Sequence, residues 1–331
     1  MPALTGHRDG ACSHMLRAVP LQMPVPQSQP ADLFAELRRL TADADRGDWP
    51  AVAAFLGGLR SLDDLAVACG QVEDRLSDEV LQRVPPGDPS WLLAQTILGV
   101  RTVRHGWNIR GTGWASSVTR QQWAGFHEYL NRAEQILIEV TARDPRQGYA
   151  WLERMIVCRG ISLGHDEARR RYDRLGAHHP HAYIAGYHLV QQLQPKWGGS
   201  WEKVSEFGAE LLRTAPAGSL GLLAVLAGHM ERFHACDSDA EGTALLRAPA
   251  VVAQIHQVAD QTVRHPAFQG GYRFHTAHDY FAMLFSLIGD HAAAAPHFRA
   301  LAGRRTPLWA SYFDRPGTAY ANLRDRALAR G

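Results

Sequence analysis

Several histidines and carboxylates of this chain could together form an acid–base site. They lie in segments that follow successive prolines, and they are Glu153, His188, His229 with Glu231, and His278 with Asp279. A neutral imidazole can carry a proton or bind a metal, and a nearby carboxylate can orient it and raise its basicity. General acid–base catalysis requires such groups within hydrogen-bond reach of a substrate. Whether they can act together depends on the elements that carry them.

The same residues also have a structural interpretation. The chain has 17 histidines, so some share a helix face by chance, and an inward histidine commonly hydrogen-bonds within a core. Packing residues, a polar binding groove and a catalytic or metal site therefore all stay open. The catalytic candidates are Glu153, His188, His229 and Glu231. No cofactor and no metal are predicted, although His188 and His229 are the residues most suited to ligate one.

Aromatic and polar side chains in the same segments could line a groove beside these candidates. The predicted groove residues are Trp107, Arg110, Trp114, Tyr187, Trp197, His278 and Asp279. Known catalytic signatures are missing: there is no GxSxG or HExxH string, and the RGTG string at Arg110 is too short for a dinucleotide fingerprint. Classical hydrolase chemistry is therefore disfavoured.

The positioning elements are indicated by prolines that recur at nearly constant spacing. Pro145 and Pro180 are 35 residues apart, and Pro180 and Pro216 are 36 residues apart. This period is typical of stacked helical hairpins of the tetratricopeptide kind, in which each pair of helices buries its apolar face against its neighbours. In such stacks the first helix of each hairpin lines the concave surface, and the candidate residues fall in those helices.

Positions within each repeat agree with this period. Twelve residues before each proline, where two helices approach closely, the chain has Ala133, Ala168 and Val204. Four residues further on, a large residue should fill the space between hairpins, and the chain has Leu137, Tyr172 and Gly208 there. The third unit thus lacks this large side chain, although Phe207 lies beside it. The predicted fold class is all-α, a right-handed α-solenoid whose clearest repeats span residues 118–235.

Outside these repeats the sequence predicts further helices and one irregular segment. Residues 1–30 are rich in proline and are expected to be a disordered extension, with Met15 and Met23 as alternative starts to Met1. Residues 31–331 are expected to form one domain, with a first helix from Ala31 to Arg46. Ser61 and Ser200 are predicted helix N-caps. Pro296 should kink a C-terminal helix or reset its start.

Composition restricts the partners. Lys and Arg number 35 against 33 Asp and Glu, which offers no general attraction for phosphate backbones or anionic lipid. No apolar run is long enough to span a bilayer, and no signal-peptide core is present, so we expect a cytoplasmic protein without nucleic-acid or membrane partners. The scattered cysteines show no CxxC pairing and are expected to be free thiols: Cys12, Cys69, Cys158 and Cys236.

Two stretches carry a resemblance to a known family. They are WNIRGTGWASSVTRQQWAGFHEYLNRA, from Trp107 to Ala133, and QPKWGGSWEKVSEFG, from Gln194 to Gly208. Together they resemble an actinobacterial family of helical-repeat proteins of unknown function, with the PKWGGS element as the most distinctive part. The resemblance implies a helical-repeat fold and an actinobacterial source, and it brings no catalytic residues.

Two classes of function follow. The first, which we favour, is a binding module whose concave groove recognises a protein, a peptide or a small molecule. The second is an enzyme of actinobacterial specialised metabolism that uses the His/Glu cluster in that groove. A deep closed cavity where several candidates converge would favour the enzyme, and an open shallow groove would favour the binding module.

Overall fold

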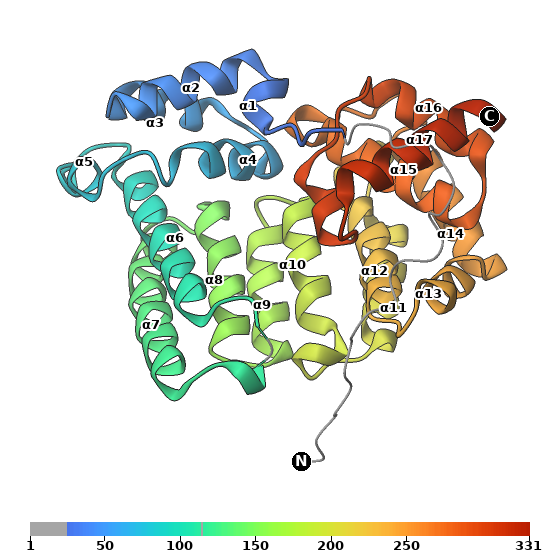
Figure 1. Ribbon diagram of the computed structural model, residues 1–331. Helices are drawn as coiled ribbons and strands as arrows, with labels where there is room; N and C mark the ends of the chain where they lie inside the picture. The colour runs from blue at the N-terminus through green and yellow to red at the C-terminus, as the bar shows by residue number, and fades with distance from the viewer. Residues whose placement is uncertain (1–24, 114) are drawn as a thin grey trace.

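The protein is helical throughout the part that the computed structural model describes, residues 25–113 and 115–331 (Figure 1). This part contains seventeen α-helices and five short 3₁₀ helices. It forms no strand, and one isolated backbone bridge joins Gln27 and Arg305. The expected all-α class is therefore confirmed. No described helix combines the length and apolarity that a membrane span requires. The predictions for residues 1–24 and for Trp114 lie outside the described residues.

Five helices form the N-terminal part of the described chain. They are α1 (Pro30–Leu33), α2 (Ala35–Asp45), α3 (Trp49–Gly58), α4 (Leu62–Val72) and α5 (Asp78–Gln82). The helix expected from Ala31 to Arg46 is interrupted, because Phe34 has an extended backbone and its ring packs edge-on against Tyr272 at 4.9 Å. The folded chain also begins before Ala31, since the Ser28 amide donates to the Arg305 carbonyl at 2.9 Å.

Eight helices follow and pack as consecutive pairs. They are α6 (Trp91–Arg110) with α7 (Arg120–Arg143), α8 (Gly148–Gly160) with α9 (His165–Gly176), α10 (Tyr183–Leu193) with α11 (Trp201–Thr214), and α12 (Leu223–His234) with α13 (Asp239–Leu246). Pro145, Pro180 and Pro216 each follow the second helix of a pair. A proline cannot continue a helix, so its recurrence marks where these pairs end.

The residues within the pairs pack as their spacing suggests. The three residues expected at close helix approaches are all buried: Ala133, Ala168 and Val204. Leu137 is fully buried, and Tyr172 packs edge-on against Phe207 with ring centroids 5.3 Å apart. Phe207 therefore faces the preceding pair, and Gly208 leaves its own position without a side chain.

The C-terminal part contains four further helices. They are α14 (Pro249–Gln261), α15 (Phe274–Ile288), α16 (His291–Leu301) and α17 (Pro316–Arg330), with the 3₁₀ helices η4 (Gly271–Arg273) and η5 (Pro307–Ser311) between them. Helix α16 does not begin at Pro296, as one alternative predicted, but contains it. Its start is fixed by Asp290, whose side chain accepts a hydrogen bond from the Ala293 amide at 2.9 Å.

Helix α4 connects the N-terminal helices to distant parts of the chain. Ser61 caps this helix as predicted, accepting a hydrogen bond from the Asp64 amide at 3.4 Å. The buried Asp63 carboxylate accepts from the amides of Tyr183 and Ile184, at 2.9 and 2.8 Å, and so caps α10 from another helix. In Figure 1 the N-terminal helices accordingly lie across one end of α6, α8 and α10.

A buried ion network joins α7, α8 and α9. One Glu134 oxygen accepts from Arg154 and Arg171 at 2.9 Å each, and the two arginine side chains are only 10% and 3% exposed. Arg171 also pairs with Glu167 at 2.6 Å. Because buried charges require partners, this network fixes how the second pair of helices sits on α7.

Candidate ligand-binding site

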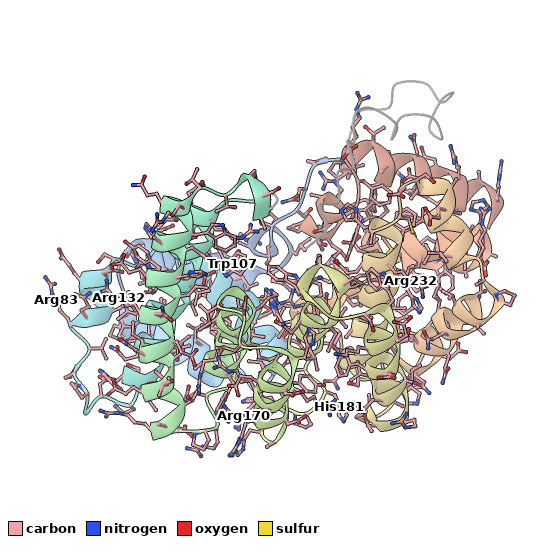
Figure 2. All side chains as sticks on the ribbon, turned by 90° about the horizontal axis from the view of Figure 1, so that it is seen from below. Arg83, Trp107, Arg132, Arg170, His181 and Arg232 are labelled. Atoms are coloured by element: carbon pink, nitrogen blue, oxygen red, sulfur yellow. The ribbon has the colours of Figure 1, made fainter. Side chains whose placement is uncertain are left out.

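Three residues from separate segments meet around the guanidinium of Arg159. The Cζ atom of Arg159, near the end of α8, lies 6.0 Å from the ring centroid of Trp107 and 5.7 Å from that of Trp197. The two indoles meet edge to face at 6.2 Å, and Arg159 Nη1 donates to the His188 carbonyl at 3.5 Å. Figure 2 places Trp107 among the helices, with Arg132 toward the outside. We call Trp107, Arg159, His188 and Trp197 the arginine–tryptophan cluster.

Arg159 has no carboxylate partner within ion-pair distance among the described residues. Its pKa is lowered, and the largest cause is burial, which disfavours the charged form. Yet all four cluster residues are partly exposed. Arg159 is thus largely desolvated, and part of its side chain still reaches solvent.

The PKWGGS element builds one side of this cluster. Pro195 opens the 3₁₀ helix η2 (Pro195–Trp197), since its fixed backbone suits a first helical turn. Gly198 then adopts a left-handed backbone with φ of 82°, which glycine tolerates best. The resulting turn ends η2 directly after Trp197 and holds the indole against Arg159.

The rest of this element is a tight connection into α11. A Cβ atom on Gly199 would lie 1.9 Å from the Leu193 carbonyl oxygen, so only glycine fits there. Ser200 caps α11 as predicted, because its side chain accepts a hydrogen bond from the Lys203 amide at 3.3 Å. The glycine and the cap explain the distinctive sequence as a turn that positions a side chain.

Arg110 has a structural role beside the cluster. Its guanidinium lies over Trp107 and Trp123, with distances of 5.7 and 5.4 Å to the ring centroids. It also donates to the carbonyls of Gly111 and Gly113, at 2.9 and 3.2 Å. Through these contacts Arg110 stabilises the loop that follows α6.

A second group of buried polar residues lies between α4, α6 and α8. Glu153 is 6% exposed and forms no hydrogen bond or ion pair with a described residue. Burial and the neighbouring Glu73 raise its pKa to about 8. Burial also raises the pKa of Glu73, to about 7, although Glu73 pairs with Arg104. Glu153 is therefore protonated near neutral pH and can donate a proton.

The remaining candidates near the cluster differ in how well they are paired. Burial lowers the pKa of His188 well below its usual value, and its Nδ1 is a buried atom without a hydrogen-bond partner. Tyr187, beside it, is partly exposed. Glu231 accepts from Lys196 Nζ and from Tyr312 Oη, at 3.2 Å each. Its carboxylate is thus already paired.

His229 does not join these residues. Its Nε2 donates to Gln254 Oε1 at 2.6 Å, which turns the imidazole toward α14 and away from Glu231. His229 lines a separate cavity with residues of α11 and α13. The four catalytic candidates therefore do not form one site.

His278 and Asp279, which the sequence predicted to line a groove, make internal packing contacts. His278 shares an Nδ1–Nδ1 hydrogen bond of 2.9 Å with His297, and both rings pack against phenylalanines. The Asp279 carboxylate accepts from the Thr306 amide at 2.9 Å and from Trp309 Nε1 at 2.7 Å. Both residues hold the C-terminal helices together.

The metal-ligating residue types are scattered. Among the described residues, no three His, Cys, Asp or Glu side chains gather as a metal site requires. His188 and His229 face different surroundings, and Cys69 and Cys158 are buried thiols. The arrangement that remains for chemistry is the arginine–tryptophan cluster, with Glu153 on the same helix as Arg159.

Sequence reasoning missed the central residue of this cluster. An arginine near the end of a helix ordinarily interacts with the helix dipole, and no local signal sets Arg159 apart from the other arginines. It also missed Glu73 and Lys196, which approach from other segments. Only the folded arrangement brings these residues to the candidates of α8 and α12.

Comparison with protein-family models, curated proteins and solved structures found no match to this chain. The resemblance to an actinobacterial family therefore stays a prediction.

Proposed function

We propose that this protein binds a small organic anion at the arginine–tryptophan cluster. The observation that supports the proposal is the Arg159 guanidinium, which is desolvated and has no carboxylate partner among the described residues. A buried charge is stable only with a counter-charge, and a carboxylate or phosphate can accept two parallel hydrogen bonds from one guanidinium. The ligand would supply the partner that the chain lacks.

The surroundings of Arg159 favour a ligand with a flat or apolar body. Trp107 and Trp197 are partly exposed, so their rings offer surface for stacking. An aromatic carboxylate or an aryl phosphate combines these features.

Several broader predictions belong to the same proposal. We propose that α6–α13 form a right-handed solenoid of tetratricopeptide-like hairpins, whose first helices carry the site. A cytoplasmic location and the absence of nucleic-acid partners also stay proposals. They rest on the repeat spacing and on the nearly balanced charge of the chain.

A second candidate function is an enzyme, and one observation favours it. Glu153 and Glu73 have pKa values raised to about 8 and about 7, which suits general acid–base catalysis near neutral pH. Glu153 and Arg159 lie on the same helix, α8, and the charge of Arg159 acts on the Glu153 carboxyl. If the ligand is converted to a product, Glu153→Gln should abolish turnover and retain binding.

Native mass spectrometry of the freshly purified protein tests the proposed function. We expect a small acidic molecule that is released on denaturation and is absent from Arg159→Gln. Losing a buried charged contact weakens binding by about 30-fold or more. Arg132→Gln, which changes an exposed arginine of α7, is the control and should keep the ligand. If Arg159→Gln retained the same ligand, the ligand would bind at a site other than the arginine–tryptophan cluster.

A further inference from the structure

A cavity of about 340 Å³ lies between α11, α12, α13 and α14. Its apolar wall includes Val204, Val225 and Phe233, and its polar wall contains His229 hydrogen-bonded to Gln254. The volume lies near the lower end of the range for small-molecule sites. It is separate from the arginine–tryptophan cluster, since the residues that line it include none of that cluster.

The repeat pattern explains why this cavity exists. Gly208 lines it and occupies the position where the two preceding repeats have Leu137 and Tyr172. A Cβ atom on Gly208 would meet only Val225, at 3.8 Å or more. The large side chain that occupies this position in the other repeats is therefore missing here.

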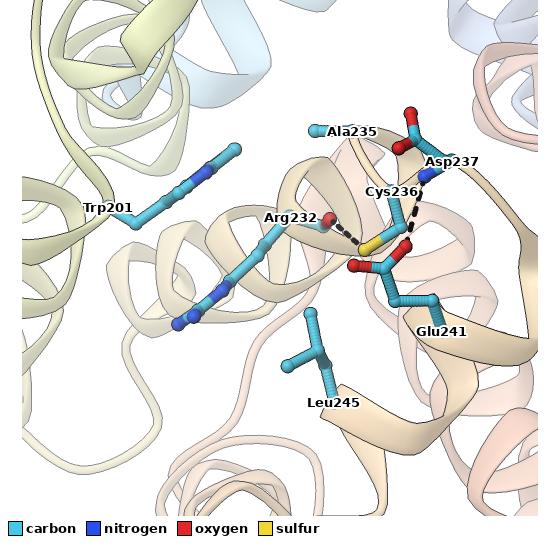
Figure 3. A pocket seen from close by; sticks show the side chains of 7 residues that line it. All are labelled: Trp201, Arg232, Ala235, Cys236, Asp237, Glu241 and Leu245. Atoms are coloured by element: carbon cyan, nitrogen blue, oxygen red, sulfur yellow. Dashed lines mark hydrogen bonds between the residues drawn. The ribbon is translucent and has the colours of Figure 1, made fainter.

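One side of the cavity carries a positive charge. The Arg232 guanidinium makes no hydrogen bond or ion pair with a described residue. Arg232, Trp201 and Leu245 also border an adjoining depression of about 290 Å³. Figure 3, a view of this depression, shows the Arg232 side chain extending away from Glu241. Because Arg232 lines both hollows, its charge is available to a ligand in the cavity.

We propose that this cavity binds a molecule with an apolar body and one anionic group. The apolar body takes the place of the missing side chain at Gly208, and the anionic group pairs with Arg232. Charge complementarity favours a carboxylate amphiphile over an uncharged or cationic one.

Calorimetric titration with decanoate, and with decanol as its uncharged counterpart, tests this proposal. We expect one decanoate in this cavity per chain, also when Arg159→Gln removes the anion site of the arginine–tryptophan cluster, and weaker binding of decanol. Gly208→Leu should weaken decanoate binding at least about tenfold, because its side chain fills the cavity. Arg232→Gln should weaken decanoate binding about fivefold and leave decanol binding unchanged.

Matched variants separate binding from folding. Ala209→Leu adds the same side chain to the exposed neighbouring position and should bind decanoate normally. If Gly208→Leu does not fold, Ser205→Phe provides an independent block, since Ser205 is an exposed residue on the rim. Arg159→Gln should remove any decanoate bound at the arginine–tryptophan cluster and keep the decanoate bound in this cavity, so this proposal can fail independently of the proposed function. No binding of decanoate, equal binding by wild type and a folded blocking variant, or equal affinity for decanoate and decanol would overturn it.

Discussion

Replacing Glu134 with alanine is expected to lower the free energy of unfolding by about 3–5 kcal/mol. The carboxylate lies between the guanidiniums of Arg154 and Arg171, whose side chains are 10% and 3% exposed. Its removal leaves two buried positive charges close together without their shared partner. Urea denaturation followed by circular dichroism measures the change.

Glu139→Ala is the matched control for this substitution. Glu139 lies on the same helix and pairs with Arg143 at 2.8 Å, but the two side chains are 52% and 50% exposed. Such an exposed pair contributes about 0.5 kcal/mol or less. Equal losses from the two substitutions would mean that the buried network does not stabilise the fold.

Glu153→Gln is expected to stabilise the protein at alkaline pH. The folded-state pKa of Glu153 is raised to about 8 from an ordinary value of 4.5, so folding favours the protonated carboxyl. The contribution of the protonated Glu153 carboxyl to the free energy of unfolding is complete below pH 4.5 and is lost as the pH rises through about 8. Glutamine stays neutral, and the variant should therefore exceed wild type in free energy of unfolding by about 2–4 kcal/mol at pH 8.

Urea denaturation of both proteins should be repeated across this pH range, because other groups titrate within it. Burial raises the pKa of Asp279 to about 7 and lowers that of His278 to about 4. These groups are common to both proteins, so the difference between wild type and Glu153→Gln isolates Glu153. A difference that stays constant between about pH 4.5 and about pH 8 would show that the Glu153 pKa is not raised.

Local signals in the sequence predicted much of the fold. The recurring prolines correctly marked the ends of α7, α9 and α11, and Ser61 and Ser200 cap helices as expected. These features depend on neighbouring residues. The capping of α10 by Asp63 reaches an amide 120 residues away, and no local pattern indicates such a contact.

The candidate site was predicted only in part. Trp107 and Trp197 do meet, but around Arg159, which the sequence did not single out. His229 and Glu231 are two residues apart and so point about 200° apart around a helix. Helical geometry alone could therefore have separated them. The role of Asp279 depends on segments that follow it in the chain and could not be predicted locally.

Thermal unfolding of wild type and Arg159→Gln, with and without benzoate or phenyl phosphate, tests the central claim most directly. Without a ligand, Arg159→Gln should be at least as stable as wild type, because it removes a desolvated charge that has no counter-charge. A binding anion should then raise the melting temperature of wild type alone. A large loss of stability in ligand-free Arg159→Gln, or the same anion-induced increase in both proteins, would contradict the assignment of Arg159 to ligand binding.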